Sequence, residues 1–332
     1  MIGQETHEVE RKIAAILEIL SDSSDPLGGR IISRRLKERG IDLGERAVRY
    51  HLRIMDERGL TRSVGNRDGR EITQPGLEEL RSSLVYDKVG FVTGRIELLA
   101  YLTSFDIEKH TGCLPIDVSL FAKEDFTTAL KAMRDIFRAG LCASDLVAVA
   151  TEGEKLGDLV VPKGKIGLAT VSCIVISGSL LKAGIPIDSR FGGLIQIRNY
   201  EPCRFVDLIE YHGSTLDPLE IFIASKMTSV SEVARKGEGK ALASFHEIPM
   251  LSRPAVEAIL ERLKTLDLCK LFVIGKTTEP ICETQVNSNK IGLILFSGLN
   301  PAASAVEENI PVINKAMSGI MDIGQLRSFK SL

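Results

Sequence analysis

The segment GERAVRYHLRIMDERGL, residues 44–60, followed by TRSVGNRDGREIT, residues 61–73, decides the fold of the N-terminal part of the chain. At roughly 100° per residue, one stripe of a short helix collects the apolar positions Val48, Leu52 and Met55. The opposite side carries Arg46, Tyr50 and Arg53, with Arg49 beside them. The stretch therefore predicts a helix that buries one face and presents arginines on the other.

A β-hairpin is predicted directly after this helix. Residues 60–64 and 70–73 are extended runs joined by a Gly-Asn-Arg-Asp-Gly turn, with Arg67 at its tip. A cationic helix next to a cationic hairpin suits a DNA major groove and the phosphates beside it. We therefore expect a winged helix-turn-helix with the DNA-contacting residues Arg46, Arg49, Tyr50, Arg53, Arg62, Arg67 and Arg70.

The flanking segments complete the order of elements of a winged helix. Helical spacing predicts helices over residues 6–21 and 27–39, with Val9 and Ile31 on their buried faces. A proline suited to a first helical turn predicts a further helix over 75–86.

The charge distribution separates this fold from its alternative, a small helical bundle whose arginines are merely solvated. Residues 25–73 hold twelve Lys and Arg against eight Asp and Glu, a net charge of +4 in a chain whose total is −2. Cationic charge is therefore concentrated on the segment with the groove-binding shape. We expect a DNA-binding domain over residues 1–86. Because the excess is modest, a dimer that contacts two half-sites is expected.

Composition narrows the class of the whole chain. With 332 residues, of which 44% are hydrophobic and 26% charged, we expect an ordinary soluble protein of two or three domains. The absence of Trp and an aromatic content of 5% argue against base stacking as a binding mode. No signal peptide or membrane span is expected, and hence a cytoplasmic location. Six scattered cysteines without paired spacing predict no metal site. No cofactor is expected either.

The second strong signal is an internal duplication within residues 87–332. Lys-Ile-Gly-Leu begins two stretches, 165–186 and 290–311, which align without gaps and are identical at eight of 22 positions. Related patterns extend over 136–186 and 263–311. We therefore expect a two-lobed, internally duplicated α/β regulatory domain in which each lobe has a buried strand, a tight loop and a helix. The fold class of the chain is then α+β.

The duplicated loops are candidates for ligand binding. A loop of small residues that opens a helix directs backbone N–H groups at one point, where the helix dipole favours an anion. Asn300 is expected to cap its helix, with Pro301 in the first turn. Arg190 would bind a carboxylate, and Gly192 and Gly193 would let a ligand approach the backbone. Each loop alone fits a plain connection equally well, but the pair predicts a cleft lined by Ser172, Cys173, Arg190, Gly192, Gly193, Ser214, Thr215, Ser297, Gly298 and Asn300.

These motifs together resemble a known family. They are Lys-Ile-Gly-Leu, Gly-Ile-Pro-Ile-Asp-Ser-Arg-Phe-Gly-Gly at 184–193, Gly-Ser-Thr-Leu-Asp-Pro-Leu-Glu at 213–220 and Ser-Gly-Leu-Asn-Pro at 297–301. Together with the winged helix, these motifs are similar to the NrpR family of archaeal nitrogen regulators over essentially the whole chain. The winged helix alone is generic, because a similar module also precedes a bacterial ribonuclease. The resemblance implies a transcriptional repressor of nitrogen-assimilation genes. Such a repressor binds palindromic operators as a dimer and is released by 2-oxoglutarate, sometimes with a PII-type partner.

Three alternatives to this function stay open. Some family members carry two regulatory domains in tandem and this chain carries one, so it could act as a co-regulator through a partner repressor. An RNA-binding module is the second alternative, although the major groove of A-form RNA is too deep and narrow for a helix. An enzyme is the third, and the lack of a nucleophile–base set, a Walker loop or a Gly-x-Gly-x-x-Gly motif speaks against it.

Overall fold

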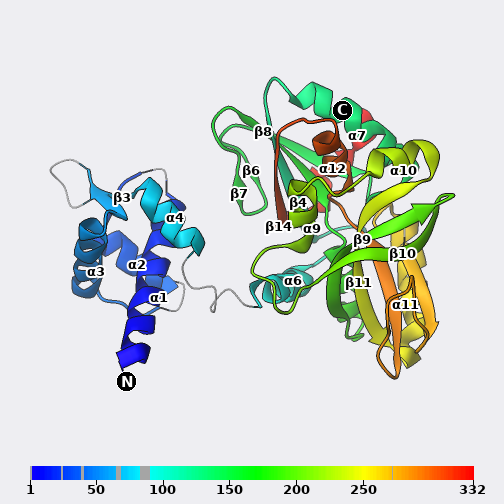
Figure 1. Ribbon diagram of the computed structural model, residues 1–332, viewed down its shortest axis with the longest axis horizontal. Coiled ribbons are helices and arrows are strands. Elements are labelled where there is room, and N and C mark those ends of the chain that lie inside the picture. The colour runs from blue at the N-terminus through cyan, green and yellow to red at the C-terminus, as the bar shows by residue number, and fades with distance from the viewer. Residues whose placement is uncertain (1, 24, 39–40, 65–68, 83–89, 271) are drawn as a thin grey trace. The chain divides into compact units, whose positions relative to one another are not determined.

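The computed structural model (Figure 1) describes residues 2–23, 25–38, 41–64, 69–82, 90–270 and 272–332. The chain divides into two compact units, Met1–Lys88 and Val89–Leu332. The fold class is α+β, with a winged helix followed by a larger unit of helices and sheets. None of the described helices is long and apolar enough to cross a membrane.

The N-terminal unit has the order of a winged helix, and its three-stranded sheet has the order β1-β3-β2. Its elements are α1 (Ile2–Ser21), β1 (Leu27–Gly28), α2 (Gly29–Glu38), α3 (Glu45–Glu57), β2 (Thr61–Ser63), β3 (Gly69–Ile72) and α4 (Gln74–Ser82). The predicted helices and hairpin strands are confirmed. The strand β1, which is too short to show a period, was not predicted and pairs with β3. The predicted turn at 65–68 and the end of the fourth helix at 83–86 lie outside the described residues.

The helices of this unit pack around one core because each carries apolar residues on one face. Its buried helical residues include Ile13, Ile16, Leu17, Leu20, Ile32, Leu36, Val48, Leu52 and Met55. Val9 and Ile31, which were expected on buried faces, are 37% and 39% exposed. Ile31 precedes the buried Ile32 and therefore points about 100° away from the core, whereas Val9 lies one turn before the buried Ile13 of α1.

The C-terminal unit contains two five-stranded sheets with the orders β14-β4-β8-β5-β15 and β10-β9-β11-β13-β12, and neighbouring strands are antiparallel. Its first half comprises β4 (Cys113–Ala122), α7 (Phe126–Ala139), β5 (Leu146–Thr151), β8 (Lys165–Val171), α8 (Ile174–Lys182) and β9 (Asp188–Arg198). The second half repeats this order with β11 (Gly239–Pro249), α11 (Arg253–Thr265), β12 (Phe272–Thr277), β13 (Lys290–Phe296), α12 (Asn300–Glu307) and β14 (Val312–Asp322). The other elements are α6 (Phe91–Leu102), β6 (Lys155–Leu156), β7 (Leu159–Val160), β10 (Glu201–Glu210), α9 (Pro218–Ala224), α10 (Val230–Lys236), β15 (Arg327–Ser328) and 3-10 turns at Met250–Ser252, Ile323–Gln325 and Phe329–Ser331.

The two halves exchange their last strands. Strand β9 of the first half pairs with β11 of the second, and β14 of the second half pairs with β4 of the first. The central strands are covered on both faces, as the apolar runs predict. In β13, for example, Ile291, Leu293 and Leu295 belong to one core and Ile294 and Phe296 to another. Each sheet is therefore built from both copies of the duplicated sequence.

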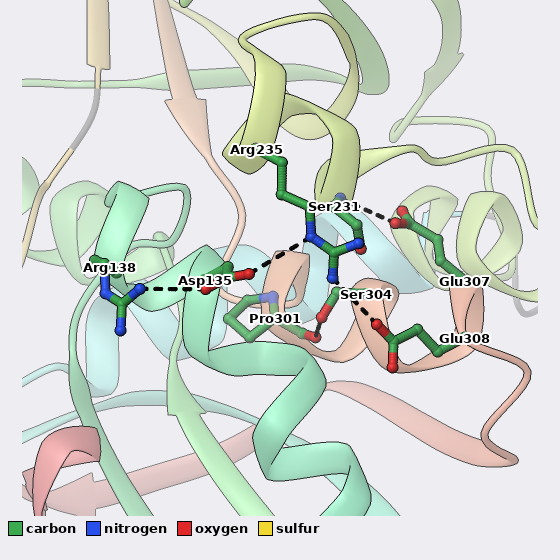
Figure 2. Close-up of polar contacts among 8 residues, drawn as sticks. All are labelled: Asp135, Arg138, Ser231, Arg235, Pro301, Ser304, Glu307 and Glu308. Atoms are coloured by element: carbon green, nitrogen blue, oxygen red, sulfur yellow. Dashed lines mark hydrogen bonds and ion pairs between the residues drawn. The ribbon is translucent and has the colours of Figure 1, made fainter.

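Polar contacts join three helices of this unit (Figure 2). Arg235 of α10 lies 3.5 Å from Asp135 of α7 and 3.3 Å from Glu308 at the end of α12. The Glu307 carboxylate accepts hydrogen bonds from the backbone N–H groups of Val230 and Ser231, at 2.7 and 3.0 Å. A carboxylate at a helix N-terminus is favoured by the helix dipole. These contacts fix α12, which begins at one of the duplicated loops, to α7 and α10.

Candidate functional site

Helix α3 presents its arginines to solvent, as its sequence predicts. The exposed residues of this helix include Arg46, Arg49, Tyr50 and Arg53. The Arg53 side chain is 71% exposed, and its guanidinium carbon lies 5.8 Å from the centre of the Tyr50 ring. Glu45 and Glu57, each one turn away, pair with Arg49 and Arg53 at 2.8 and 3.8 Å. Exposed pairs of this kind are weak, so both guanidinium groups can exchange them for phosphates or base edges.

The hairpin uses its two described arginines differently. Arg62 is 71% exposed and pairs across the strands with Glu71 at 2.9 Å. Arg70 is only 21% exposed, and its Nε lies 2.7 Å from the Asp56 carboxylate at the end of α3. Arg70 was expected to contact DNA, but its fork is occupied by Asp56, so the structure assigns it to bracing β3 against α3. Arg67, the expected tip of the wing, lies outside the described residues.

In the C-terminal unit the two duplicated loops meet at a small cavity of about 30 Å³. Ser172 and Cys173, between β8 and α8, line it together with Ser297 and Leu299, between β13 and α12. The other lining residues are Ile96, Asp117, Ile174, Tyr211, Asp217, Leu219, Ser244, His246, Ala316 and Met317. This space has room for one or two water molecules. The structure therefore brings the two loops together, around a cavity that is small.

Buried acids form one side of this cavity. The Asp117 carboxylate on β4 accepts a hydrogen bond from the Met317 N–H at 2.9 Å, and burial raises its pKa to about 7. Asp217 caps α9 by accepting from the N–H groups of Leu219 and Glu220 at 2.9 and 3.1 Å, and burial raises its pKa to about 6. Both carboxyl groups are therefore partly protonated near neutral pH, and a protonated carboxyl can donate a hydrogen bond to an anion.

A buried histidine also lines the cavity. The His246 Nε2 lies 2.7 Å from Ser244 Oγ, and its Nδ1 lies 3.0 Å from Ser189 Oγ. Burial lowers the pKa of His246 to about 3, so the ring is neutral at physiological pH. The Cys173 thiol lies 3.6 Å from Ser244 Oγ, and burial raises the pKa of this thiol to about 12. A thiol in this state is a poor nucleophile, which favours a binding role for the site.

Strand register shows that the acid on β4 and a serine on β11 are duplicated positions. Asp117 lies opposite Thr170 in the β4–β8 pair, and Ser244 lies opposite Leu295 in the β11–β13 pair. Thr170 and Leu295 are equivalent residues of the two aligned copies. One copy therefore carries a carboxylate where the other carries a hydroxyl.

The hydrogen bonds to the exchanged strands repeat in the same way. Ser119, two residues after the acid of β4, bonds to Asn314 of β14 at 2.8 Å. His246, two residues after the serine of β11, bonds to Ser189 of β9. The framework of contacts is thus duplicated, while the chemistry that each copy brings to the cavity differs.

Arg190 does not line the cavity, although the sequence analysis placed it there. Its guanidinium lies 3.2 Å from the buried Glu247 carboxylate and 5.1 Å from the centre of the Phe191 ring. Successive residues of a strand point to opposite faces, and Glu247 follows His246 on β11. Arg190, which lies at an irregularity of the β9–β11 pairing, contacts Glu247 and therefore points away from the His246 ring. The fork expected for a ligand carboxylate is occupied by the protein's own glutamate.

The glycines expected to admit a ligand instead admit neighbouring segments of the protein. A Cβ atom at Gly192 would lie 2.9 Å from the Tyr211 hydroxyl, and one at Gly193 would lie 2.6 Å from a backbone oxygen of β10. At Gly298 a Cβ atom would lie 2.2 Å from the Val171 carbonyl oxygen. These positions need glycine for internal packing.

Three further expected residues lie beside the cavity without lining it. Asn300 is fully buried, begins α12 instead of capping it, and bonds through its side chain to both the N–H and the C=O of Leu242. Ser214 and Thr215 lie in the turn between β10 and α9. Of the ten residues proposed for the cleft, the structure brings Ser172, Cys173 and Ser297 to the cavity wall.

Comparison with known proteins identifies the larger unit. Residues 89–328 match the family of NrpR regulatory domains NRD1 and 2, which covers most of the chain. The chain belongs to the NrpR family. Residues 14–80 of this NrpR-family protein also match the Ribonuclease R winged-helix domain.

Individual relatives agree with this assignment. The Global nitrogen regulator NrpRI of Methanosarcina mazei is 38% identical over 95% of this chain and 97% of the relative. The Global nitrogen regulator NrpR of Methanococcus maripaludis is 32% identical over 94% of this chain but 54% of its own length, so this chain spans about half of that relative. The crystal structure of a nitrogen repressor-like protein from Methanococcus jannaschii has the same fold, with a TM-score of 0.60 at 23% identity over 72% of this chain and 98% of that one. These names are those of regulators, which supports the prediction that the NrpR-family chain is not an enzyme.

Several cavity residues of this NrpR-family protein were missed by the sequence analysis. They are Asp117, Tyr211, Asp217, Ser244 and His246. A usable signal was a polar residue inside an otherwise apolar strand, as in Ile-Asp-Val at 116–118. Within the described ranges, no group of three or more His, Cys, Asp or Glu side chains is arranged to hold a metal ion.

Proposed function

We propose that this NrpR-family protein is a transcriptional repressor of nitrogen-assimilation genes that binds palindromic operator DNA as a homodimer and is released by 2-oxoglutarate. The arginine face of α3 is the observation that carries the proposal. This helix is the second of the helix-turn-helix, the one that enters the major groove in proteins of this class. The names of the relatives, global nitrogen regulators, point to the same process.

The geometry supports specific roles for the exposed side chains. Arg49 and Arg53 are long enough to reach base edges from α3, and Arg62 on the hairpin suits a neighbouring phosphate. One copy offers few such contacts, so two copies at a fixed half-site spacing are needed for tight binding. Arg70, held by Asp56, sets the position of the hairpin relative to α3.

The cavity at the duplicated loops is the candidate site for 2-oxoglutarate. A five-carbon dicarboxylate does not fit into about 30 Å³, so the cavity must open when it binds. No Lys or Arg of the described chain lines this cavity. The anion would instead accept hydrogen bonds from protonated Asp117 and Asp217 and from the serine hydroxyls, close to the first turns of α8 and α12.

Opening the cavity offers a route from effector to DNA. Ile96 of α6 forms part of the wall, and α6 is the first helix of the regulatory unit after the winged helix in sequence. An effector that displaces α6 therefore acts on the helix to which the DNA-binding unit is connected. A displacement of this kind alters half-site spacing in a dimer without any change at the arginines themselves.

The DNA part is tested by selecting duplexes from a random pool with the full chain. The selected duplex and the corresponding RNA duplex are then compared by fluorescence anisotropy at equal salt. We expect palindromic sequences and a preference for DNA of at least about tenfold, because a helix does not fit the A-form major groove. Equal affinity for the two duplexes would rule out the proposed mode of binding.

The effector part is tested by calorimetric titration of 2-oxoglutarate with and without saturating operator duplex, with glutarate as the control that lacks the keto group. Linkage requires the operator to weaken the effector by the same factor by which the effector weakens the operator, typically about 5- to 150-fold. Identical effector affinity in both titrations would contradict direct coupling. Signalling through a partner, such as a PII-type protein, would then be the remaining route.

A further inference from the structure

Strand β14 is interrupted by a bulge at residues 316–318. Its pairing with β4 shifts between Lys315 and Gly319, so that three residues of β14 lie opposite the single residue Asp117 of β4. Met317, in the middle of the bulge, has a φ of 55°, in the left-handed region that residues other than glycine rarely adopt. The shape of this segment is therefore set by its contacts rather than by regular strand pairing.

Two carboxyl groups hold successive N–H groups of the bulge. Glu220 of α9 accepts a hydrogen bond from the Ala316 N–H at 2.5 Å. Asp117 accepts one from the Met317 N–H at 2.9 Å. Asp117, Ala316 and Met317 also line the cavity at the duplicated loops. The bulge is thus a part of the cavity wall that is held by side chains, and it can move without breaking the pairing of the flanking residues.

The same bulge is bonded to α6. The Met317 carbonyl oxygen accepts two hydrogen bonds from the Arg95 guanidinium, from Nε at 3.1 Å and from Nη2 at 3.0 Å. Nη2 also lies 2.7 Å from the Asp158 carboxylate, and the Asp158 N–H donates to the Ser318 carbonyl oxygen at 2.8 Å. Met317 therefore bonds to the cavity acid through its N–H and to α6 through its C=O.

We propose that Arg95 is a positioning residue that transmits occupancy of the cavity to α6. This inference rests on the proposed function, because it takes 2-oxoglutarate as the ligand of the cavity. An Asp117 carboxyl that donates a hydrogen bond to this anion is neutral, and it accepts a weaker bond from the Met317 N–H than a carboxylate does. Once released, Met317 leaves its strained left-handed conformation and its carbonyl oxygen turns away from Arg95. Helix α6 then loses two hydrogen bonds to β14, and its position changes.

Hydrogen exchange of the parent chain, resolved to single amides by NMR, tests the first step. Saturating 2-oxoglutarate should speed exchange of the Met317 amide by about tenfold or more, because this N–H loses its acceptor. A ligand that only rigidifies its site would slow this exchange. Unchanged or slower exchange in protein that calorimetry shows to be saturated would overturn the proposal. If 2-oxoglutarate does not bind at all, the proposed function fails, and this inference fails with it.

The variant Arg95→Ala tests the second step. It should bind operator DNA more weakly than the parent, and 2-oxoglutarate should weaken that binding by less than about twofold, against about 5- to 150-fold in the parent. Its affinity for 2-oxoglutarate without DNA should rise by about threefold or more, because the bonds to Met317 no longer oppose opening of the cavity. A merely structural loss would not tighten effector binding. Arg262→Ala, which removes an exposed arginine of α11 and its ion pair with Glu108, should leave all these values unchanged.

A conservative variant covers the case in which Arg95→Ala does not fold. Arg95→Lys keeps the charge beside Asp158 but loses the fork that donates twice to Met317. Its operator binding should therefore also respond less to 2-oxoglutarate than that of the parent. If the parent responds and the folded Arg95 variants respond by the same factor, Arg95 does not transmit the signal and the proposal is wrong. A parent chain that binds 2-oxoglutarate without any change in operator affinity would contradict the proposed function instead.

Discussion

The charged groups of the two units differ in one physical respect. On α3 the arginines are exposed and stay ionised, whereas the acids of the regulatory cavity are buried and take up protons near neutral pH. An exposed cation interacts with an anion through water and counterions, so salt controls its binding. A buried acid exchanges a proton, so pH controls what it can bind. The two sites of one chain should therefore respond to different properties of the solution.

The largest expected effect is on DNA. Two copies that each bring three arginines, Arg49, Arg53 and Arg62, into the groove and against the backbone would neutralise about six phosphate charges, and raising salt from 50 to 200 mM should then weaken binding by ~10³-fold. Effector affinity should change by less than about threefold over the same range, because its site is buried. Anisotropy and calorimetry across a salt series measure both slopes. Similar salt dependences of DNA affinity and effector affinity would contradict the proposed difference between the two sites.

A second effect is on stability. The pKa of Asp117 is about 7 in the folded protein, above its ordinary value of 3.8, so the folded state binds this proton more tightly than the unfolded chain. The contribution of Asp117 to the free energy of unfolding therefore falls as pH rises from about 4 to 7, by on the order of 1.4 kcal/mol per pH unit. Asp117→Asn should take this contribution out of the slope measured by urea unfolding, whereas those of Asp217 and Glu220, whose pKa values burial raises to about 6 and about 7, should remain. Glu124→Gln, a change at an exposed acid, should keep the whole slope. Parallel pH profiles of the parent and Asp117→Asn would show that the acid is not desolvated.

A third effect concerns Arg53 of α3, whose side chain is 71% exposed. Arg53→Ala should lower operator affinity by ~1–3 kcal/mol if its guanidinium reaches a base edge, with relaxed preference at one position of each half-site. Arg134→Ala, on the exposed face of α7, is the control with the same change of charge. Competition binding against single-base variants of the operator measures both quantities. An equal loss of affinity for all operator variants would indicate that Arg53 contacts a phosphate instead of a base edge.

The smallest effect is on the effector. The carboxylates of 2-oxoglutarate stay ionised between pH 6 and 8, whereas Asp117 loses its proton around pH 7. The protonated fraction of Asp117 falls from about one half at pH 7 to about one tenth at pH 8. Affinity should therefore fall about fivefold over this interval, because the ionised acid repels the ligand and no longer donates a hydrogen bond. Calorimetry at three pH values gives the profile, and Asp117→Asn should flatten it. An affinity that rises with pH would place the effector elsewhere.

Local periodicity explains why the winged helix could be predicted in detail. Helical stripes such as Val48, Leu52 and Met55 depend on residues within two turns, and burial confirms them. The duplicated loops were found in the same way, because their resemblance lies in contiguous residues. The convergence of Ser172 and Ser297 on one cavity followed from treating the copies as a pair.

The rest of the site depends on pairing between distant strands. Asp117 meets Met317 only because β14 crosses to the sheet of the first half, and no spacing in the sequence records that contact. The orientation of Arg190 was missed for a related reason. Its partner Glu247 lies on β11, and the pairing of β9 with β11 was not foreseen. The contacts of Asp117 and Arg190 thus could not be predicted without the exchange of strands between the two halves.

That exchange also bears on how the chain is made. Strand β4 is synthesised about 200 residues before β14, with which it pairs, so the first sheet cannot be completed until the second half has left the ribosome. During this interval the edge of β4 is an unpaired template for other strands. Contacts of such long sequence separation also slow folding. The regulatory unit should therefore mature late, as one cooperative body, and depend on protection of its nascent first half.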